Sequence, residues 1–248
     1  MDSNERCSMY QFESKIRYSE VDADCNLTLS ALMNYFQDCS NFQSEELGMG
    51  VQYLADNHVT WMLSSWQICI NELPKLTEPV IIQTWPYDMK AFYGYRNFSM
   101  NRQDGSRCAY ANSVWVLMDT DSGRPVKVPE HVIETYGAEP RLEMECSERK
   151  IPIPEGMEIR GEMVVPSHFI DSNQHMNNEK YVVIALEYVP KDFQIGELRV
   201  EYKKEAKLGN KIIVAVKETG ERFTIALNDE EGKPYAVIAF LRKTRGGK

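Results

Sequence analysis

The sequence lacks several features that would assign it to a specialised class of protein. No apolar run approaches the ~20 residues that a membrane-spanning helix needs, so we expect no membrane span. None of the six cysteines lies in a CxxC motif, and the four histidines show no paired spacing of the HExxH kind. We therefore expect neither a metal site nor a cofactor. Basic residues are also scarce, with 28 Lys and Arg against 37 Asp and Glu, which argues against nucleic-acid binding.

What is present is typical of a globular protein with a substantial core. Hydrophobic residues make up 43% of the 248 residues and charged residues 26%. The first ten residues contain no apolar stretch of the kind found in a secretion signal. The cysteines are scattered through the first part of the chain, so we interpret them as reduced thiols. Together these features predict a cytoplasmic protein.

The predicted secondary structure follows the same order twice. In the first half, a short strand near 9–18 precedes a helix over 29–47, in which apolar residues recur at three and four positions. In the second half, a strand near 158–166 precedes a helix that begins after the polar stretch 169–175. Alternating or β-branched runs after each helix predict further strands, at 59–70, 79–87, 92–101, 107–118, 197–206, 211–218, 221–227 and 235–241.

This pattern predicts an α+β fold made of two similar units, each a long helix wrapped by a curved antiparallel sheet. We place the N-terminal unit at 1–125 and the C-terminal unit at 155–248. The segment 126–154 between them is rich in proline, glycine and charge, and we expect a surface linker there. The alternative is one continuous α+β domain without duplication.

The polar stretch FIDSNQHMNNEKY at 169–181 is the most informative part of the chain. Asp171, Asn173 and His175 alternate along it, so in an extended segment they would point to one side. The helix that follows offers free backbone N–H groups and the positive end of its dipole. Hydrolysis or acyl transfer needs these parts: a base or water-positioning group, and donors for a developing oxyanion.

Each of these residues also has a structural interpretation. Asp171 could form an Asx turn or cap the helix, and Asn177 is an equally good N-cap. A lone histidine such as His175 is often only a hydrogen-bonded structural residue. The corresponding positions in the first half are Asp22, Asp24 and Asn26, and they include no histidine. We therefore expect catalysis in the C-terminal unit and a substrate-binding role for the N-terminal unit.

The doubled unit and the D-x-N-x-H-x-N-N run before the second helix resemble the acyl-ACP thioesterase family, whose members are tandem hotdog proteins. The resemblance covers most of the chain, from about Phe12 to Arg242. A tyrosine and an acidic residue follow downstream in the family pattern, and Tyr202 and Glu205 match them here. Plant members have a cysteine after that glutamate, whereas this chain has Ala206, which argues against a Cys–His nucleophile.

The resemblance implies hydrolysis of a fatty acyl-[acyl-carrier-protein] thioester by water attack. It implies Asp171, Asn173, His175 and Glu205 as the catalytic residues, without assigning the proton acceptor. We expect Trp61, Met62, Trp66 and Asn177 to bind substrate. The alternatives are an acyl-CoA thioesterase on the same scaffold and a non-catalytic acyl-binding hotdog protein. Both a monomer and a homodimer remain open.

An acyl carrier protein is acidic and would need a basic landing surface on this acidic chain. The candidate residues are Lys203, Lys204, Lys207, Lys211, Arg242, Lys243, Arg245 and Lys248. A solvated charged face is the alternative interpretation.

Overall fold

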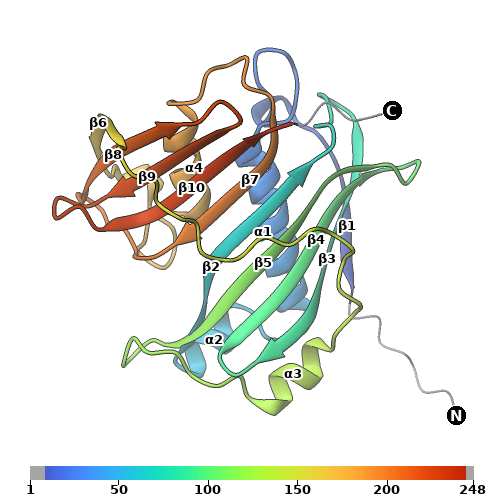
Figure 1. Ribbon diagram of the computed structural model, residues 1–248. Helices are drawn as coiled ribbons and strands as arrows, with labels where there is room; N and C mark the ends of the chain where they lie inside the picture. Colours follow the sequence, from blue (N-terminus) through green and yellow to red (C-terminus); the bar gives the residue numbers. More distant parts are fainter. Residues whose placement is uncertain (1–8, 244–248) are drawn as a thin grey trace, which may run out of the picture. The chain divides into compact units, whose positions relative to one another are not determined.

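The computed structural model describes residues 9–243 and divides into two compact units (Figure 1). Unit 1 contains the chain up to Leu63 together with Asn71–Cys146. Unit 2 contains Ser64–Ile70 and the chain from Ser147 onward. In the part of the chain that the structure describes, no helix is both long enough and apolar enough to cross a membrane.

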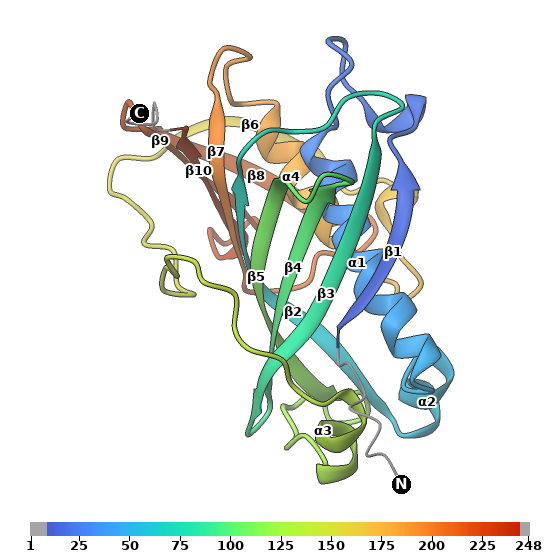
Figure 2. The same ribbon diagram turned by 90° about the vertical axis from the view of Figure 1, so that its right-hand side faces the viewer.

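Unit 1 is a hotdog unit, with one long helix packed on an antiparallel sheet. Helix α1 (Leu29–Glu46) contacts strands β1 and β3, and Figure 2 shows it running along that face. The sheet order in this unit is β1-β3-β4-β5-β2. The strands are β1 (Tyr10–Lys15), β2 (Val59–Ile70), β3 (Pro79–Lys90), β4 (Tyr93–Arg102) and β5 (Arg107–Asp119). Short helices are η1 (Tyr18–Glu20), α2 (Val51–Asp56) and α3 (Glu130–Tyr136).

Unit 2 repeats this arrangement with a shorter helix, α4 (Asn178–Leu186), which contacts β9 and β10. Its sheet runs from residues 64–70 of β2 through β7, β10, β9 and β8 to β6. The strands are β6 (Glu158–Val164), β7 (Ile195–Tyr202), β8 (Lys211–Glu218), β9 (Arg222–Asn228) and β10 (Pro234–Arg242), with the short helix η2 (Ser167–Phe169) after β6. The α+β double hotdog expected from the sequence is confirmed.

The sequence explains where α1 begins and ends. The side chain of Thr28 accepts a hydrogen bond from the Ala31 N–H at 3.2 Å, which caps the helix. After the helix, Gly48 adopts a φ of 69°, a left-handed conformation that favours glycine. Phe36 is wholly buried on the inner face, with its ring 5.3 Å from that of Phe98 on β4. The helix therefore carries the centre of the unit 1 core.

The segment 126–154, expected as a surface linker, has a different structure. Its first part contains α3, and it groups with unit 1 as far as Cys146, whereas the remainder groups with unit 2. Val132 and Tyr136 of α3 are buried, and the Tyr136 hydroxyl lies 2.7 Å from Ser44 Oγ of α1. The helix was not predicted, because a single turn or two among prolines leaves little periodic pattern.

A buried arginine also links α3 to the core of unit 1. Arg96 on β4 is only 8% exposed, and its guanidinium donates to the side chains of Gln43 and Thr84. The same group lies 5.5 Å from the centroid of the Tyr136 ring, within range of a cation–π contact. Neutral oxygens and an aromatic face thus solvate this charge.

We predict that Phe36→Ala lowers the free energy of unfolding by about 3–5 kcal/mol, because it removes a wholly buried ring from a packed core. The matched control is Phe42→Ala on the same helix, where the side chain is 45% exposed and the loss should be much smaller. Urea denaturation followed by circular dichroism measures both. Equal losses for the two variants would contradict the placement of the core.

Candidate active site

The stretch 171–176 is a tight loop, not the extended run that the sequence pattern indicated. One oxygen of Asp171, Oδ1, accepts hydrogen bonds from the backbone N–H of Asn173 at 2.8 Å and of His175 at 3.3 Å. The backbone N–H of Asp171 donates to the His175 carbonyl at 2.8 Å, and Gln174 between them has a φ of 62°. The segment is therefore not extended, and the condition under which the three side chains would share one side is not met. Asp171 organises an Asx-type loop.

His175 lies against Glu205, although the two are distant in sequence. His175 Nε2 is 2.9 Å from Glu205 Oε2, and both side chains are about one-third exposed or less. The sequence pattern predicted a strand over 197–206, which would include Glu205. Strand β7 ends at Tyr202, so Glu205 lies in the loop after the strand. The Met176 N–H donates to the Ala206 carbonyl at 2.8 Å, which joins the residues next to His175 and Glu205.

The side chains of Asn173 and Asn177 differ in their surroundings. Asn173 is exposed, and within the described residues no hydrogen bond holds its side-chain amide. Asn177 is the N-cap of α4, with its side-chain oxygen accepting from the Glu179 N–H at 3.2 Å. The side-chain oxygen of Asn177 therefore serves as a helix cap. Its side-chain amide nitrogen can still donate a hydrogen bond, and substrate binding by Asn177 stays a prediction.

Unit 1 contains the same loop with different side chains. Asp22 Oδ1 accepts from the backbone N–H groups of Asp24 and Asn26, each at 2.9 Å. The Leu27 N–H donates to the Pro74 carbonyl at 2.8 Å, as Met176 does to Ala206 in unit 2. By this correspondence Asn26 occupies the place of His175. Leu73, which precedes Pro74, occupies that of Glu205. The first loop therefore has the backbone of the second without its imidazole–carboxylate pair.

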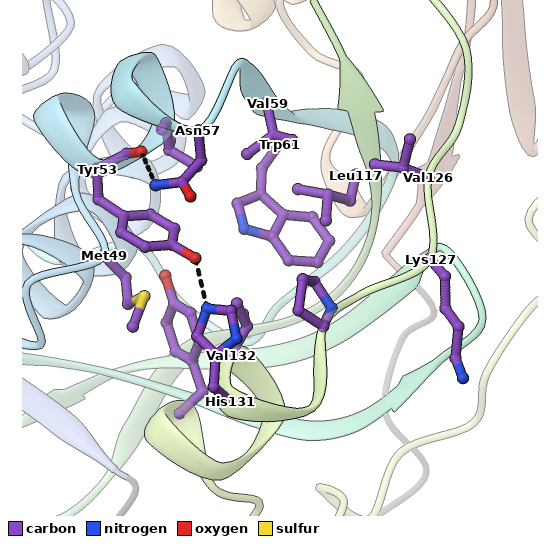
Figure 3. Close-up of a pocket in the computed structure, with 13 residues that line it drawn as sticks. Met49, Tyr53, Asn57, Val59, Trp61, Leu117, Val126, Lys127, His131 and Val132 are labelled. Carbon is purple, nitrogen blue, oxygen red and sulfur yellow. Dashed lines mark hydrogen bonds between the residues drawn. The ribbon is translucent and has the colours of Figure 1, made fainter.

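Unit 1 contains a cavity of about 130 Å³ lined mainly by apolar side chains (Figure 3). Its walls come from α2 and the residues on either side of it, from β2 and β5, and from α3 and the segment that leads into it. Trp61 of β2 is one wall, and Gly94 makes room for it, because a Cβ there would meet the indole ring at 3.1 Å. Met62 and Trp66 do not line this cavity, and Trp66 is 2% exposed. Trp61 and Trp66, both expected to bind substrate, therefore do not share this cavity.

Polar groups also reach this cavity. The Tyr53 hydroxyl and His131 Nε2 are 2.7 Å apart, as Figure 3 shows. Asn57 donates from its side chain to the Tyr53 carbonyl at 2.8 Å. Sequence reasoning did not find these residues, because α2 and α3 are too short to show periodicity.

The environment of position 206 bears on the question of a nucleophilic cysteine. Ala206 is wholly buried, so its side chain faces the interior of unit 2. The described cysteines are free thiols, and burial raises the pKa of Cys39 to about 12 and of Cys108 to about 11. Cys25, in contrast, is exposed on the unit 1 loop.

We predict that, among the cysteines that the structure describes, a small alkylating reagent at pH 8 modifies Cys25 first and leaves Cys39 and Cys108 unmodified in the native protein. Only the thiolate is nucleophilic, and burial keeps these two groups protonated and out of reach. Peptide mass spectrometry over a time course measures the order, with a urea-unfolded sample as the control. Native modification of Cys39 as fast as Cys25 would be inconsistent with its buried position.

Comparison with known proteins places these observations in a family. The acyl-ACP thioesterase N-terminal domain matches residues 8–136 and the C-terminal domain matches residues 158–240. A chloroplastic acyl-[acyl-carrier-protein] hydrolase from Cuphea viscosissima is 26% identical over 208 residues, covering 77% of this chain and 50% of the relative. Oleoyl-acyl carrier protein thioesterase 1 from Arabidopsis thaliana is 24% identical over 219 residues, covering 80% and 60%. The chain spans about half the length of the first of these relatives.

Solved structures share the fold over nearly the whole chain. An acyl-ACP thioesterase from Bacteroides thetaiotaomicron superposes with a TM-score of 0.88 at 20% identity, covering 95% of this chain and 98% of that one. The 12:0-ACP thioesterase from Umbellularia californica gives 0.84 at 18%, covering 96% and 98%. Because the two family domains match in order along the two units, the chain belongs to the acyl-ACP thioesterase family.

Proposed function

We propose that this protein hydrolyses the thioester of a fatty acyl-[acyl-carrier-protein], releasing a free fatty acid and the carrier thiol. The observation that carries the proposal is the 2.9 Å contact between His175 and Glu205, in a site whose loop also holds the exposed side chain of Asn173. Family membership supplies the substrate class. The three side chains supply a base, an orienting carboxylate and a donor for the oxyanion.

In the proposed mechanism, Glu205 accepts a hydrogen bond from the Nε2–H of His175 and so fixes the tautomer of the ring. Nδ1 is then the free acceptor, and it takes a proton from water as the water oxygen bonds to the thioester carbon. The Asn173 amide donates to the carbonyl oxygen as it becomes negative. When the tetrahedral intermediate collapses, the C–S bond breaks and the thiolate takes the proton from the imidazolium.

Asp171 acts through the loop in this mechanism. Its carboxylate binds backbone N–H groups on either side of Gln174, so it sets the position of His175 without needing to reach the substrate. The equivalent Asp22 in unit 1 does the same where there is no histidine to position. This supports a positioning role for Asp171.

For the acyl chain, we propose the unit 1 cavity as the site of its distal end. An apolar cavity of comparable size, about 150 Å³, binds a ligand of about six carbons such as benzene. The polar Tyr53–His131 pair would not favour burying a long chain beside it, so the cavity should accept a chain end of limited length. Asn177, Met62 and Trp66 remain secondary candidates for substrate contact.

The proposed carrier surface is less basic than the sequence indicated. Lys203, Lys204 and Lys211 pair with Glu201, Asp229 and Glu162 at 2.7–2.8 Å. For Lys207, which lies between them in the sequence, the described residues provide no ion pair. Arg245 and Lys248 lie outside the described residues. The proposal of a carrier-protein substrate therefore rests on the family more than on charge.

The described cysteines are free, which fits the proposed cytoplasmic location with its reducing conditions. The experiment that tests the function measures thiol release from acyl-ACP and acyl-CoA substrates of graded chain length. Faster turnover of acyl-ACP supports the proposal, and faster turnover of acyl-CoA assigns the alternative carrier. Binding of acyl thioesters without turnover would mean a non-catalytic acyl-binding protein. In the same preparations, sedimentation velocity measures whether the protein is a monomer or a homodimer.

We predict that His175→Ala and Glu205→Gln each lower kcat by at least about 100-fold on every acyl chain length. The first removes the base, and the second removes the charge that holds its tautomer. The matched control is Asp22→Ala in the unit 1 loop, which should keep near wild-type kcat. Near wild-type turnover of His175→Ala with an intact circular dichroism spectrum would rule out this mechanism.

We predict that Trp61→Ala shifts the preferred substrate toward longer chains, because it enlarges the cavity. Each further buried methylene is worth about 0.8 kcal/mol, so two extra carbons should gain roughly tenfold in relative kcat/KM. Phe42→Ala, which truncates an exposed aromatic side chain of unit 1 that does not line the cavity, is the control. An unchanged length profile for Trp61→Ala would show that this cavity does not take the acyl chain.

A further inference from the structure

Ala206 is held from both sides, and this fixes the segment that carries Glu205. Its carbonyl accepts from the Met176 N–H at 2.8 Å, directly after His175. Its own N–H donates to the hydroxyl of Tyr181 on α4 at 2.9 Å. The first bond fixes the backbone beside the imidazole, and the second fixes the backbone beside the carboxylate. Both bonds are shielded from water, because Ala206 is wholly buried.

Unit 1 keeps the first of these bonds and lacks the chemistry for the second. Its counterpart of Ala206 is Pro74, whose carbonyl accepts from Leu27 but which has no N–H to donate. Its counterpart of Tyr181 is Leu32, at the same distance along the chain from the loop aspartate, and leucine has no hydroxyl. Donor and acceptor are therefore both present in unit 2 and both missing from unit 1. The loop closes in each unit, so this bond is not needed for loop formation.

Tyr181 is well suited to holding one fixed position. Its side chain is 3% exposed, and its ring meets that of Tyr202 edge to face at 5.5 Å. Burial, with the nearby charges of Glu205 and Asp171, raises the pKa of Tyr181 to about 12. At neutral pH the hydroxyl is thus protonated and remains able to accept the hydrogen bond from the Ala206 N–H.

We propose that Tyr181 is a positioning residue for the reaction, which holds Glu205 at hydrogen-bonding distance from His175 through the backbone of Ala206. The inference rests on the proposed function, because it assigns Tyr181 a part in that same site. Tyr181 takes no part in the proton transfers of the proposed mechanism. It acts by limiting the movement of the loop after β7, on which the carboxylate would otherwise be free to shift.

The test is a double-mutant cycle between Tyr181→Phe and Glu205→Gln, with the folded fraction of each variant measured by circular dichroism. We expect Tyr181→Phe to lower kcat by roughly tenfold or more with little change in KM. In the Glu205→Gln background, the same substitution should lower kcat less than twofold, because the carboxylate that it positions is gone. The control is Tyr35→Phe, which removes the hydroxyl of a buried tyrosine on α1 that donates to Glu20 at 2.8 Å.

A purely structural role for Tyr181 gives a different result. The two tyrosine variants would then lower the melting temperature alike and keep wild-type kcat per folded molecule, or the Tyr181 and Glu205 effects would multiply. Either outcome overturns the proposal. Amide hydrogen exchange at Ala206, which should accelerate at least tenfold in Tyr181→Phe, tests the bond independently of turnover. An inactive wild-type protein refutes the proposed function, and unchanged exchange at Ala206 refutes the role of Tyr181.

Discussion

The site depends on one aspartate oxygen that accepts two backbone hydrogen bonds. In the loop of unit 2, Asp171 Oδ1 binds the N–H groups of Asn173 and His175, and this closes the chain into a turn just before α4. Few backbone conformations allow two N–H groups of the same short segment to donate to one oxygen. The direction in which residue 175 leaves the loop is therefore set by a neighbour four residues earlier. Bonds from the residues around this loop then attach it to the segment after β7.

The two units show which parts of this arrangement are scaffold and which are chemistry. Both units have the loop aspartate and a residue of left-handed conformation in the loop. Both also have a backbone hydrogen bond that joins the loop to the segment after a strand, which is β2 in unit 1 and β7 in unit 2. Cys25 and Gln174 hold that left-handed position, and neither is glycine. The residues at three equivalent positions differ between unit 1 and unit 2. They are Asn26 and His175, Leu73 and Glu205, and Pro74 and Ala206. The two loops thus share one backbone arrangement and differ in their side chains.

Much of the fold could be predicted from the sequence, because it depends on periodic burial. The bounds of β2 and β8 were predicted to the residue, and α1 to within one residue at its C-terminal end. Helices α2 and α3 were missed, because short helices depend on the surfaces against which they pack. The segment with α3 therefore looked like a linker. Its burial comes from contacts such as that of Tyr136 with Ser44, which no local pattern reveals.

The candidate site was predicted less completely, for a physical reason. Alternating polar residues look the same in a strand and in an Asx loop, so Asp171, Asn173 and His175 were assigned to an extended run. Glu205 was selected through the family resemblance, because its lysine neighbours indicate only a solvated face. Tyr181 lies at a helical spacing that matches a core residue. The role of its hydroxyl comes from the hydrogen bond that it accepts from the Ala206 N–H, and Ala206 lies far along the sequence from Tyr181.

The walls of the unit 1 cavity differ in how freely they can change. Trp61 and Leu117 belong to strands whose neighbours are hydrogen-bonded on the sheet, so altering them disturbs the pairing around them. Val126 and Pro129 come from the segment that leads into α3, outside the strands, and His131 lies in the first turn of α3. Substitutions and length changes are tolerated far better in a connecting segment such as the one that holds Val126 and Pro129. The shape of this cavity can therefore change by mutation in a connecting segment while the sheet stays unchanged.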